Sequence, residues 1–276
     1  MARTRDAAIA KMPETAALIV VAATGAAWLI SALAQATGTA IALHHHTLIE
    51  GGPTLWVALL LFLVAWQVMV AAMMLPASLP AVRSFEATAS TLSRPAVAMA
   101  AFLATYAAVW TAYGFGAFFF DVGLHRLTDA TPWLAARPWL IEASATTLAG
   151  AYQFLPVKRR GLEACRHLAG VAGGDGLHGR GSVGSGFALA SGPGGLGMRL
   201  GLRHGIDCLT CSWALMLLMF AAGFANLWWM AGLAVAMGYE TIGRHGRGAA
   251  PVIGGSLLAL AVVIVLTGWI PAFPAT

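Results

Sequence analysis

Five stretches of this chain are each long and apolar enough to cross a lipid bilayer, and this feature restricts the fold more than any other. A membrane-spanning helix needs about 20 mostly apolar residues. The sequence is 59% hydrophobic and 10% charged, whereas soluble domains are about half apolar and a quarter charged. We therefore expect residues 1–276 to form a single all-α membrane domain, a polytopic bundle of transmembrane helices. The five stretches are Ala16–Ala34, Leu55–Leu75, Ala96–Phe120, Trp133–Leu155 and Val252–Ile270.

A sixth apolar stretch, Cys208–Met237, decides how often the chain crosses the membrane. It is long for one span and contains the softer sequence Gly223-Phe-Ala-Asn226. Two short helices joined there give seven spans, whereas one long tilted helix gives six. Positive residues gather in cytoplasmic loops, and two crossings place 14 of the 16 basic residues on the side of the N-terminus. We therefore predict seven spans and a cytoplasmic N-terminus, with six spans as the alternative.

The basic residues also bear on possible partners, because the net charge is +5. They lie beside apolar stretches and are not interleaved with aromatic residues, so they indicate contact with lipid headgroups rather than nucleic acid. The first apolar stretch is longer than the core of a signal peptide, and we interpret it as a retained helix. Gly and Ser dominate residues 170–201, which predicts a flexible cytoplasmic loop.

The motif with the most chemical content opens the sixth stretch and runs His204-Gly-Ile-Asp207-Cys208-Leu-Thr-Cys211. Asp207 is a favourable helix N-cap, and a helix that begins there places Cys208 and Cys211 on one face. A helix N-terminus and basic neighbours favour the thiolate, the form that binds metals. His204 is close enough in sequence to contribute. The alternative is that both thiols are small buried residues that pack between helices.

Further soft donors are expected on the same side of the membrane. Cys165 follows the fourth stretch, while Met69 and Met73 stack on one face of the second. Thiolate and thioether ligands select Cu(I) over hard cations, and the Met69-x-x-x-Met73 spacing resembles the methionine pair that lines copper-uptake channels. Methionine also fills gaps in helix packing. Met216 and Met219 allow the same two interpretations.

Other candidates fall elsewhere. His44-His45-His46 and His125 are predicted in outer loops, where imidazoles suit Cu(II), zinc or nickel, although a solvated loop is the favoured interpretation. Glu142 falls inside the fourth stretch, and an ionisable group at membrane depth is a functional candidate. A position near the outer surface, with access to water, is the alternative for Glu142.

Four blocks of the chain carry a family resemblance: Trp66–Pro76, Ala149–Lys158 with Cys165-Arg166, Gly201–Gly205, and Cys208–Met216 continuing to Asn226–Met230. Together they resemble the predicted metal-binding integral membrane proteins of bacteria, domain-of-unknown-function family 2182. The resemblance implies a multi-pass protein of the inner membrane with a metal-related role. Members often carry cysteine where Gly161 and Ser212 stand here, so the resemblance also implies a site with fewer thiols.

Three hypotheses are compatible with these residues. In the first, the protein binds a soft metal, copper or alternatively zinc, for transport, sensing or delivery to a partner. In the second, it is a structural accessory subunit of a larger membrane complex. In the third, it is a thiol- or metal-dependent membrane oxidoreductase, although no catalytic residues or cofactor motif are visible, so a non-enzymatic role is favoured. The expected metal ligands are Cys208, Cys211, Cys165, His204, Met69 and Met73.

Overall fold

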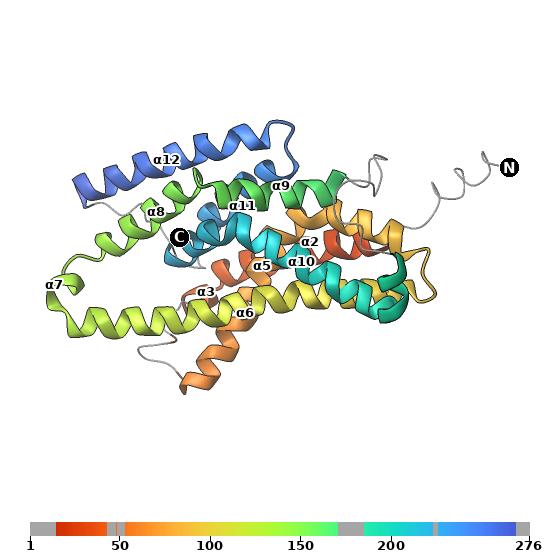
Figure 1. Ribbon diagram of the computed structural model, residues 1–276. Helices are drawn as coiled ribbons and strands as arrows, with labels where there is room; N and C mark the ends of the chain where they lie inside the picture. The colour runs from red at the N-terminus through yellow and green to blue at the C-terminus, as the bar shows by residue number, and fades with distance from the viewer. Residues whose placement is uncertain (1–14, 43–47, 49–52, 171–184, 223–225, 269–276) are drawn as a thin grey trace.

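The computed structural model describes residues 15–42, 48, 53–170, 185–222 and 226–268 of the protein. Every regular element in these ranges is a helix (Figure 1), which confirms the all-α class for this part of the chain. Four helices are long and apolar enough to cross a membrane: α2 (Thr15–Ala36), α5 (Leu55–Ala89), α6 (Pro95–Ala130) and α12 (Gly246–Thr267). The others are α3 (Thr39–Ala42), α7 (Pro132–Ala135), α8 (Trp139–Tyr152), α9 (Pro156–Gly170), α10 (Ser185–Ala222) and α11 (Leu227–Ile242).

Helices α5 and α6 extend beyond the apolar stretches that predicted them. They contain 35 and 36 residues, which gives each a length of about 53 Å, compared with about 30 Å for the hydrocarbon core of a bilayer. Beyond the stretch that predicted α5, Phe85 stacks on Phe102 of α6 with ring centroids 4.8 Å apart. Aromatic burial therefore continues α5 past its predicted boundary.

Helix α10 runs beside α6 (Figure 1) along a face made of glycines. A Cβ atom at Gly197 or Gly201 would overlap the carbonyl oxygens of Ala98 and Phe102 in α6. Because Gly197, Gly201 and Gly205 follow one another at intervals of four residues, they share one face and let the two backbones approach closely. Gly197 of α10 contacts Ala98 of α6, and Gly201 contacts Phe102. Because the residue numbers rise together in both helices, the two helices run parallel.

This packing corrects the loop predicted over residues 170–201. Residues 185–201 belong to α10, because their glycines allow close approach to α6 rather than conferring flexibility. Residues 171–184 of the predicted loop lie outside the described part of the chain. Helix α10 bends at Gly192, whose φ of 64° suits glycine, and Pro193 follows the bend with a φ already fixed for a helix.

The sixth apolar stretch is divided between two helices. Helix α10 ends at Ala222, and α11 begins after Asn226, whose side chain accepts a hydrogen bond from the Trp229 N–H at 3.2 Å. The short helix α9 contacts both: Cys165 reaches Cys211 in α10, and Lys158 reaches Glu240 in α11. Because these two contacts lie on opposite sides of the break, α11 returns toward the level of Cys211. The uninterrupted helix of the six-span alternative is therefore not observed.

The remaining long helices pack in two pairs, α8 with α12 and α2 with α5. Helices α8 and α12 lie side by side (Figure 1), with Gly150 of α8 packed against Gly254 and Leu258 of α12. The predicted fourth stretch is divided into α7 and α8, with Pro138 at the N-terminal boundary of α8. Helix α2 packs on α5, where the Trp28 indole donates a hydrogen bond to the Ala72 carbonyl at 3.1 Å.

The buried core is unusually rich in sulfur. A single hydrophobic cluster contains all three cysteines and seven of the eleven methionines. Aromatic residues border this region: the Trp66 indole donates to the Trp110 carbonyl at 2.9 Å, and Gly114 leaves room for the Trp66 ring. The soft donors are thus concentrated in one water-poor part of the fold. The seven methionines are Met69, Met73, Met74, Met216, Met219, Met230 and Met237.

Candidate metal centre

Cys165 of α9 meets the Cys208–Cys211 pair of α10, which lies more than 40 positions later in the sequence. The Sγ atoms of Cys165 and Cys211 lie 3.8 Å apart. Cys208 precedes Cys211 by three residues, so the two lie on one face of α10, and all three side chains are buried and free of disulfides. The sequence placed these thiols on one side of the membrane, and the tertiary structure brings them into one cluster.

Two contacts hold α9 against α10 at this point. A Cβ atom at Gly161 would lie 3.1 Å from the Cys211 backbone nitrogen, so the glycine permits a close approach. The Tyr152 hydroxyl, at the end of α8, donates a hydrogen bond to the Thr210 carbonyl at 2.6 Å. The turn between α8 and α9 is therefore anchored beside the cysteines, and this positions Cys165.

A hydrogen-bonded chain from α5 and α6 reaches the third thiol. The Ser78 hydroxyl lies 2.9 Å from the Tyr106 hydroxyl, which is itself 3.4 Å from the Cys208 Sγ. Sequence reasoning missed Ser78 and Tyr106. Tyr106 stands within an apolar stretch, and only the packing of α6 against α10 shows that it faces Cys208.

Methionine approaches the cluster from α5. The Ser212 hydroxyl, next to Cys211, bonds the Cys208 carbonyl at 2.7 Å and lies 3.6 Å from the Met74 Sδ. The predicted ligands Met69 and Met73 are buried in the same core. Met74, adjacent to Met73, therefore contacts a residue beside the thiols, although the sequence did not single it out as a ligand.

His204 is buried beside the cluster without a polar partner. Its side chain is 2% exposed, and neither ring nitrogen has a hydrogen-bond partner among the described residues. The imidazole stacks on Phe102 and Tyr106 with ring centroids 5.9 and 5.4 Å away. His204 precedes Cys208 by one helical turn, so both lie on one face of α10. Buried polar groups normally have a partner, and a bound ion would supply one.

The sulfur geometry suits a shared ion. Two thiolates bound to one metal at about 2.3 Å are about 3.8–4.0 Å apart in tetrahedral or trigonal geometry, and Cys165 and Cys211 have a separation of 3.8 Å. Among the described residues, no three His, Cys, Asp or Glu side chains form a ready-made metal-binding group. Thioether ligands fall outside that set of four residue types, and Cu(I) accepts them readily.

Cys208 and Cys211 do not lie at a helix N-terminus, so no helix end favours their thiolate form. Asp207 was predicted to cap a helix beginning at Cys208, but α10 starts at Ser185 and continues through both residues. That prediction is wrong, because the glycine face that packs on α6 lets the helix begin well before Asp207.

The Cys165 thiol in α9 has a shifted pKa. Hydrogen bonding to the thiols of Cys208 and Cys211, together with burial, raises the pKa of the Cys165 thiol well above its usual value. Cys165 is therefore protonated at neutral pH until a metal displaces the proton.

A buried ion pair joins α9 to α11 near the thiols, and the sequence analysis did not identify it. The Lys158 ammonium donates to the Glu240 carboxylate at 2.6 Å, and both side chains are almost fully buried. Arg166 donates to the carbonyls of Glu240, Thr241 and Gly243 at the end of α11. These bonds fix α9, which carries Cys165, against the hairpin formed by α10 and α11.

The other candidates do not join this centre. His125 belongs to α6, where its Nδ1 lies 3.0 Å from the Asp121 carbonyl and 3.5 Å from that residue's carboxylate. It follows Tyr106 by 19 residues, which places it about 28 Å farther along the helix. Glu142 lies in the first turn of α8 rather than at its middle. His44, His45 and His46 lie outside the described residues.

The structure combines helices that are long and apolar enough to cross a membrane with thiols, thioethers and an imidazole buried together. These two features define a class of helical membrane-associated proteins that carry soft donor groups in the core. A family model described as PpoB2, copper chaperone, matches residues 63–264. The chain therefore belongs to this copper chaperone family, and all six predicted ligands lie within the matched region. The match supports a metal-related family but does not carry the domain-of-unknown-function designation that the four blocks suggested. Neither the curated proteins nor the solved structures gave a match.

Proposed function

We propose that this protein is an integral membrane copper chaperone that binds Cu(I) through Cys165, Cys208 and Cys211. The observation that carries the proposal is the meeting of three buried thiols from two helices, with 3.8 Å between the Cys165 and Cys211 sulfurs. Soft, low-coordination sulfur sites favour Cu(I). The family match supports copper as the cargo.

The surrounding donors suggest how the ion is exchanged. Met74 lies beside Ser212, and Met69 and Met73 belong to the same core. Thioethers bind Cu(I) without having to lose a proton, so they suit transient binding, whereas thiolates hold the ion more tightly. Copper passes between methionines and thiolates by exchange of one ligand at a time. His204 supplies a further donor at the edge of the thiol cluster.

The proposed topology has seven spans, a cytoplasmic N-terminus and a location in a bacterial inner membrane. The break between α10 and α11 supports two crossings in the sixth apolar stretch. The uneven distribution of basic residues supports the orientation. In this orientation the thiols lie near the cytoplasmic boundary of the bilayer, where a metal-delivery partner meets the protein.

Zinc is the alternative cargo, and the available donors disfavour it. Structural zinc is bound by four ligands in a tetrahedral arrangement, from cysteine, histidine or carboxylate. Three thiols and His204 supply that number, but the thioethers in the same core suit Cu(I) and not Zn(II). The copper description of the family points the same way.

Elemental analysis of the detergent-purified protein tests the proposal. Wild type and Cys208→Ser/Cys211→Ser are loaded with Cu(I) or Zn(II), desalted and analysed for metal per chain. We expect about one copper per wild-type chain after full loading. At limiting copper, the double variant should hold at least about tenfold less copper than wild type. Absence of copper from both proteins would overturn the proposal. It would favour an accessory subunit whose cysteines only pack, because 3.8 Å is also compatible with simple contact between sulfurs.

A further inference from the structure

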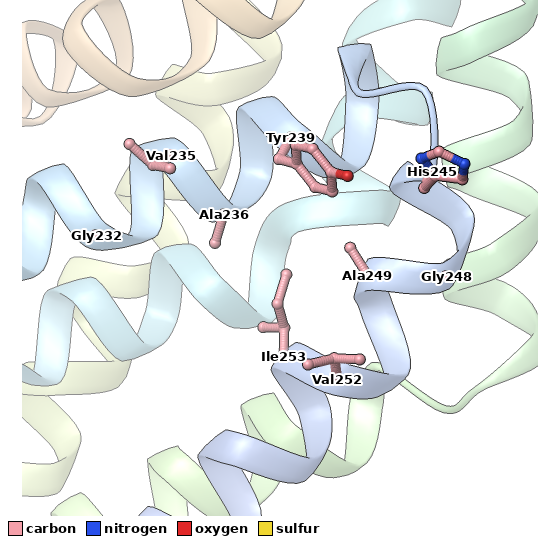
Figure 2. A pocket seen from close by; sticks show the side chains of 9 residues that line it. All are labelled: Gly232, Val235, Ala236, Tyr239, His245, Gly248, Ala249, Val252 and Ile253. Carbon is pink, nitrogen blue, oxygen red and sulfur yellow. The ribbon is translucent and has the colours of Figure 1, made fainter.

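A groove between α11 and α12 has no role in the site described above. It is an open groove of about 570 Å³, and Figure 2 shows its walls, which come from both helices, with His245 in the segment that joins them. Apart from Tyr239 and His245, its lining residues are aliphatic or glycine. Val235 and Val252 at its rim are 71% and 68% exposed. Such apolar surface requires lipid or another apolar occupant.

Two of the residues that line the groove lack side chains, which leaves it open. A Cβ atom at Gly232 or Gly248 would meet no atom within 4 Å. Among the described residues, these glycines therefore do not mediate contact between helices, unlike Gly197 and Gly201 in α10. The unfilled volume is available to a molecule from outside the protein.

The groove ends at a basic segment. Arg244, His245 and Arg247 are exposed around the connection between α11 and α12. The connection is held in place by Arg166, which donates to the carbonyls of Glu240, Thr241 and Gly243. Glu163 approaches Arg247 only to 4.0 Å, and both side chains are exposed. The backbone that carries Arg244 and Arg247 is thus held at the end of the apolar groove.

The shape of the groove distinguishes between possible occupants. Helix α11 ends at Ile242 and α12 begins at Gly246, so the two helices converge at the basic end. A spanning helix of a partner is about 10–12 Å wide with its side chains and cannot follow the groove into this narrow end. A single acyl chain is thin enough, and an anionic headgroup attached to it would reach the arginines.

We infer that this groove is a binding site for one anionic phospholipid, with an acyl chain along Gly232–Ala236 and the headgroup on Arg244 and Arg247. Basic groups between helices on the cytoplasmic side recognise such headgroups. The inference uses the membrane orientation of the proposed function but is independent of copper, so it is tested on metal-free protein. Failure of copper binding would leave it untouched.

Native mass spectrometry of delipidated protein tests the site after equilibration with an equal mixture of phosphatidylglycerol and phosphatidylcholine. We expect wild type to retain one phosphatidylglycerol in preference to phosphatidylcholine. Arg244→Gln/Arg247→Gln should weaken retention about 30-fold, from about fivefold per basic residue. Arg159→Gln/Arg160→Gln, which removes the same charge from exposed positions of α9, should retain the lipid.

A second pair of variants tests the groove itself. Gly248→Leu adds a side chain to the groove, and Gly255→Leu adds the same side chain elsewhere on α12; a Cβ atom meets nothing within 4 Å at either position. The first should lose phosphatidylglycerol and the second should keep it, with equal thermal stability of both delipidated proteins. Equal retention of the two lipids by wild type, retention by Gly248→Leu, or loss in the α9 control would each overturn the inference. Recovery of a stoichiometric protein chain in place of lipid would do so as well.

Discussion

The Sγ atoms of Cys165 and Cys211 lie 3.8 Å apart, although 46 positions separate the two residues in the chain. The contact exists because Gly161 lets α9 approach the backbone of α10 at Cys211, while Lys158 fixes the same helix to Glu240 of α11. One short helix thus brings the third thiol to the other two. The proposed copper site depends on this helix.

Replacing Cys165 with serine tests whether α9 contributes a ligand. Serine keeps the size of the side chain but removes the soft donor, so we expect Cu(I) affinity to fall at least about tenfold, measured by competition with a chromogenic chelator. The thermal transition should change little. Unaltered affinity would mean that Cys208 and Cys211 bind copper without α9.

Met74→Leu separates a ligand role from packing. Leucine is close in volume to methionine, and such exchanges usually cost less than about 1.5 kcal/mol. We expect weaker Cu(I) binding or slower transfer to an acceptor chelator, followed by stopped-flow absorbance. Met99→Leu is the matched control, since Met99 packs in a separate cluster away from the thiols. Equal behaviour of the two variants would assign Met74 to packing alone.

The pH dependence of Cu(I) binding follows from the raised pKa of the Cys165 thiol. A thiol protonated in the metal-free protein must release its proton on binding, so affinity rises with pH, by up to about tenfold per unit for each proton displaced. Competition titrations between about pH 6 and 8 measure the slope of Cu(I) affinity against pH. Cys165→Ser should lower the slope by about one, and an unchanged slope would contradict the assignment.

The buried pair Lys158–Glu240 should be structural. Lys158→Met leaves a buried carboxylate without its counter-charge and should destabilise the protein by about 3–5 kcal/mol, whereas Lys158→Met/Glu240→Leu should recover most of the loss. Thermal unfolding in detergent measures both. If the single variant were as stable as wild type, the pair would not be what holds α9 in position.

The glycine face of α10 gives a fifth prediction. Gly201→Ala places a methyl group against the Phe102 carbonyl and should cost about 1–3 kcal/mol through overpacking. Gly255→Ala, which meets no atom within 4 Å, should be neutral or slightly stabilising because alanine favours helix. Chemical denaturation of the two variants makes the comparison. Similar stability would indicate that α6 and α10 separate without cost.

Much of the helical architecture was predictable from the sequence, because a bilayer requires long apolar segments and each such segment satisfies its own backbone hydrogen bonds as a helix. The runs beginning at Leu55 and Ala96 predicted α5 and α6, although both helices continue farther than hydropathy indicates. The Gly-rich residues up to Gly201 were predicted as loop because composition alone does not distinguish flexibility from close packing. Their four-residue spacing was the signal that favoured packing.

The sequence by itself determined that the chain is helical and apolar, and which soft donors it carries: Cys165, Cys208, Cys211, His204 and the methionines. Only the tertiary structure decided which of them meet. Helical periodicity relates residues within one turn or two, as for His204 and Cys208. The approach of Cys165, Tyr106 and Met74 depends instead on how α9, α6 and α5 pack against α10, through contacts between side chains far apart in the chain.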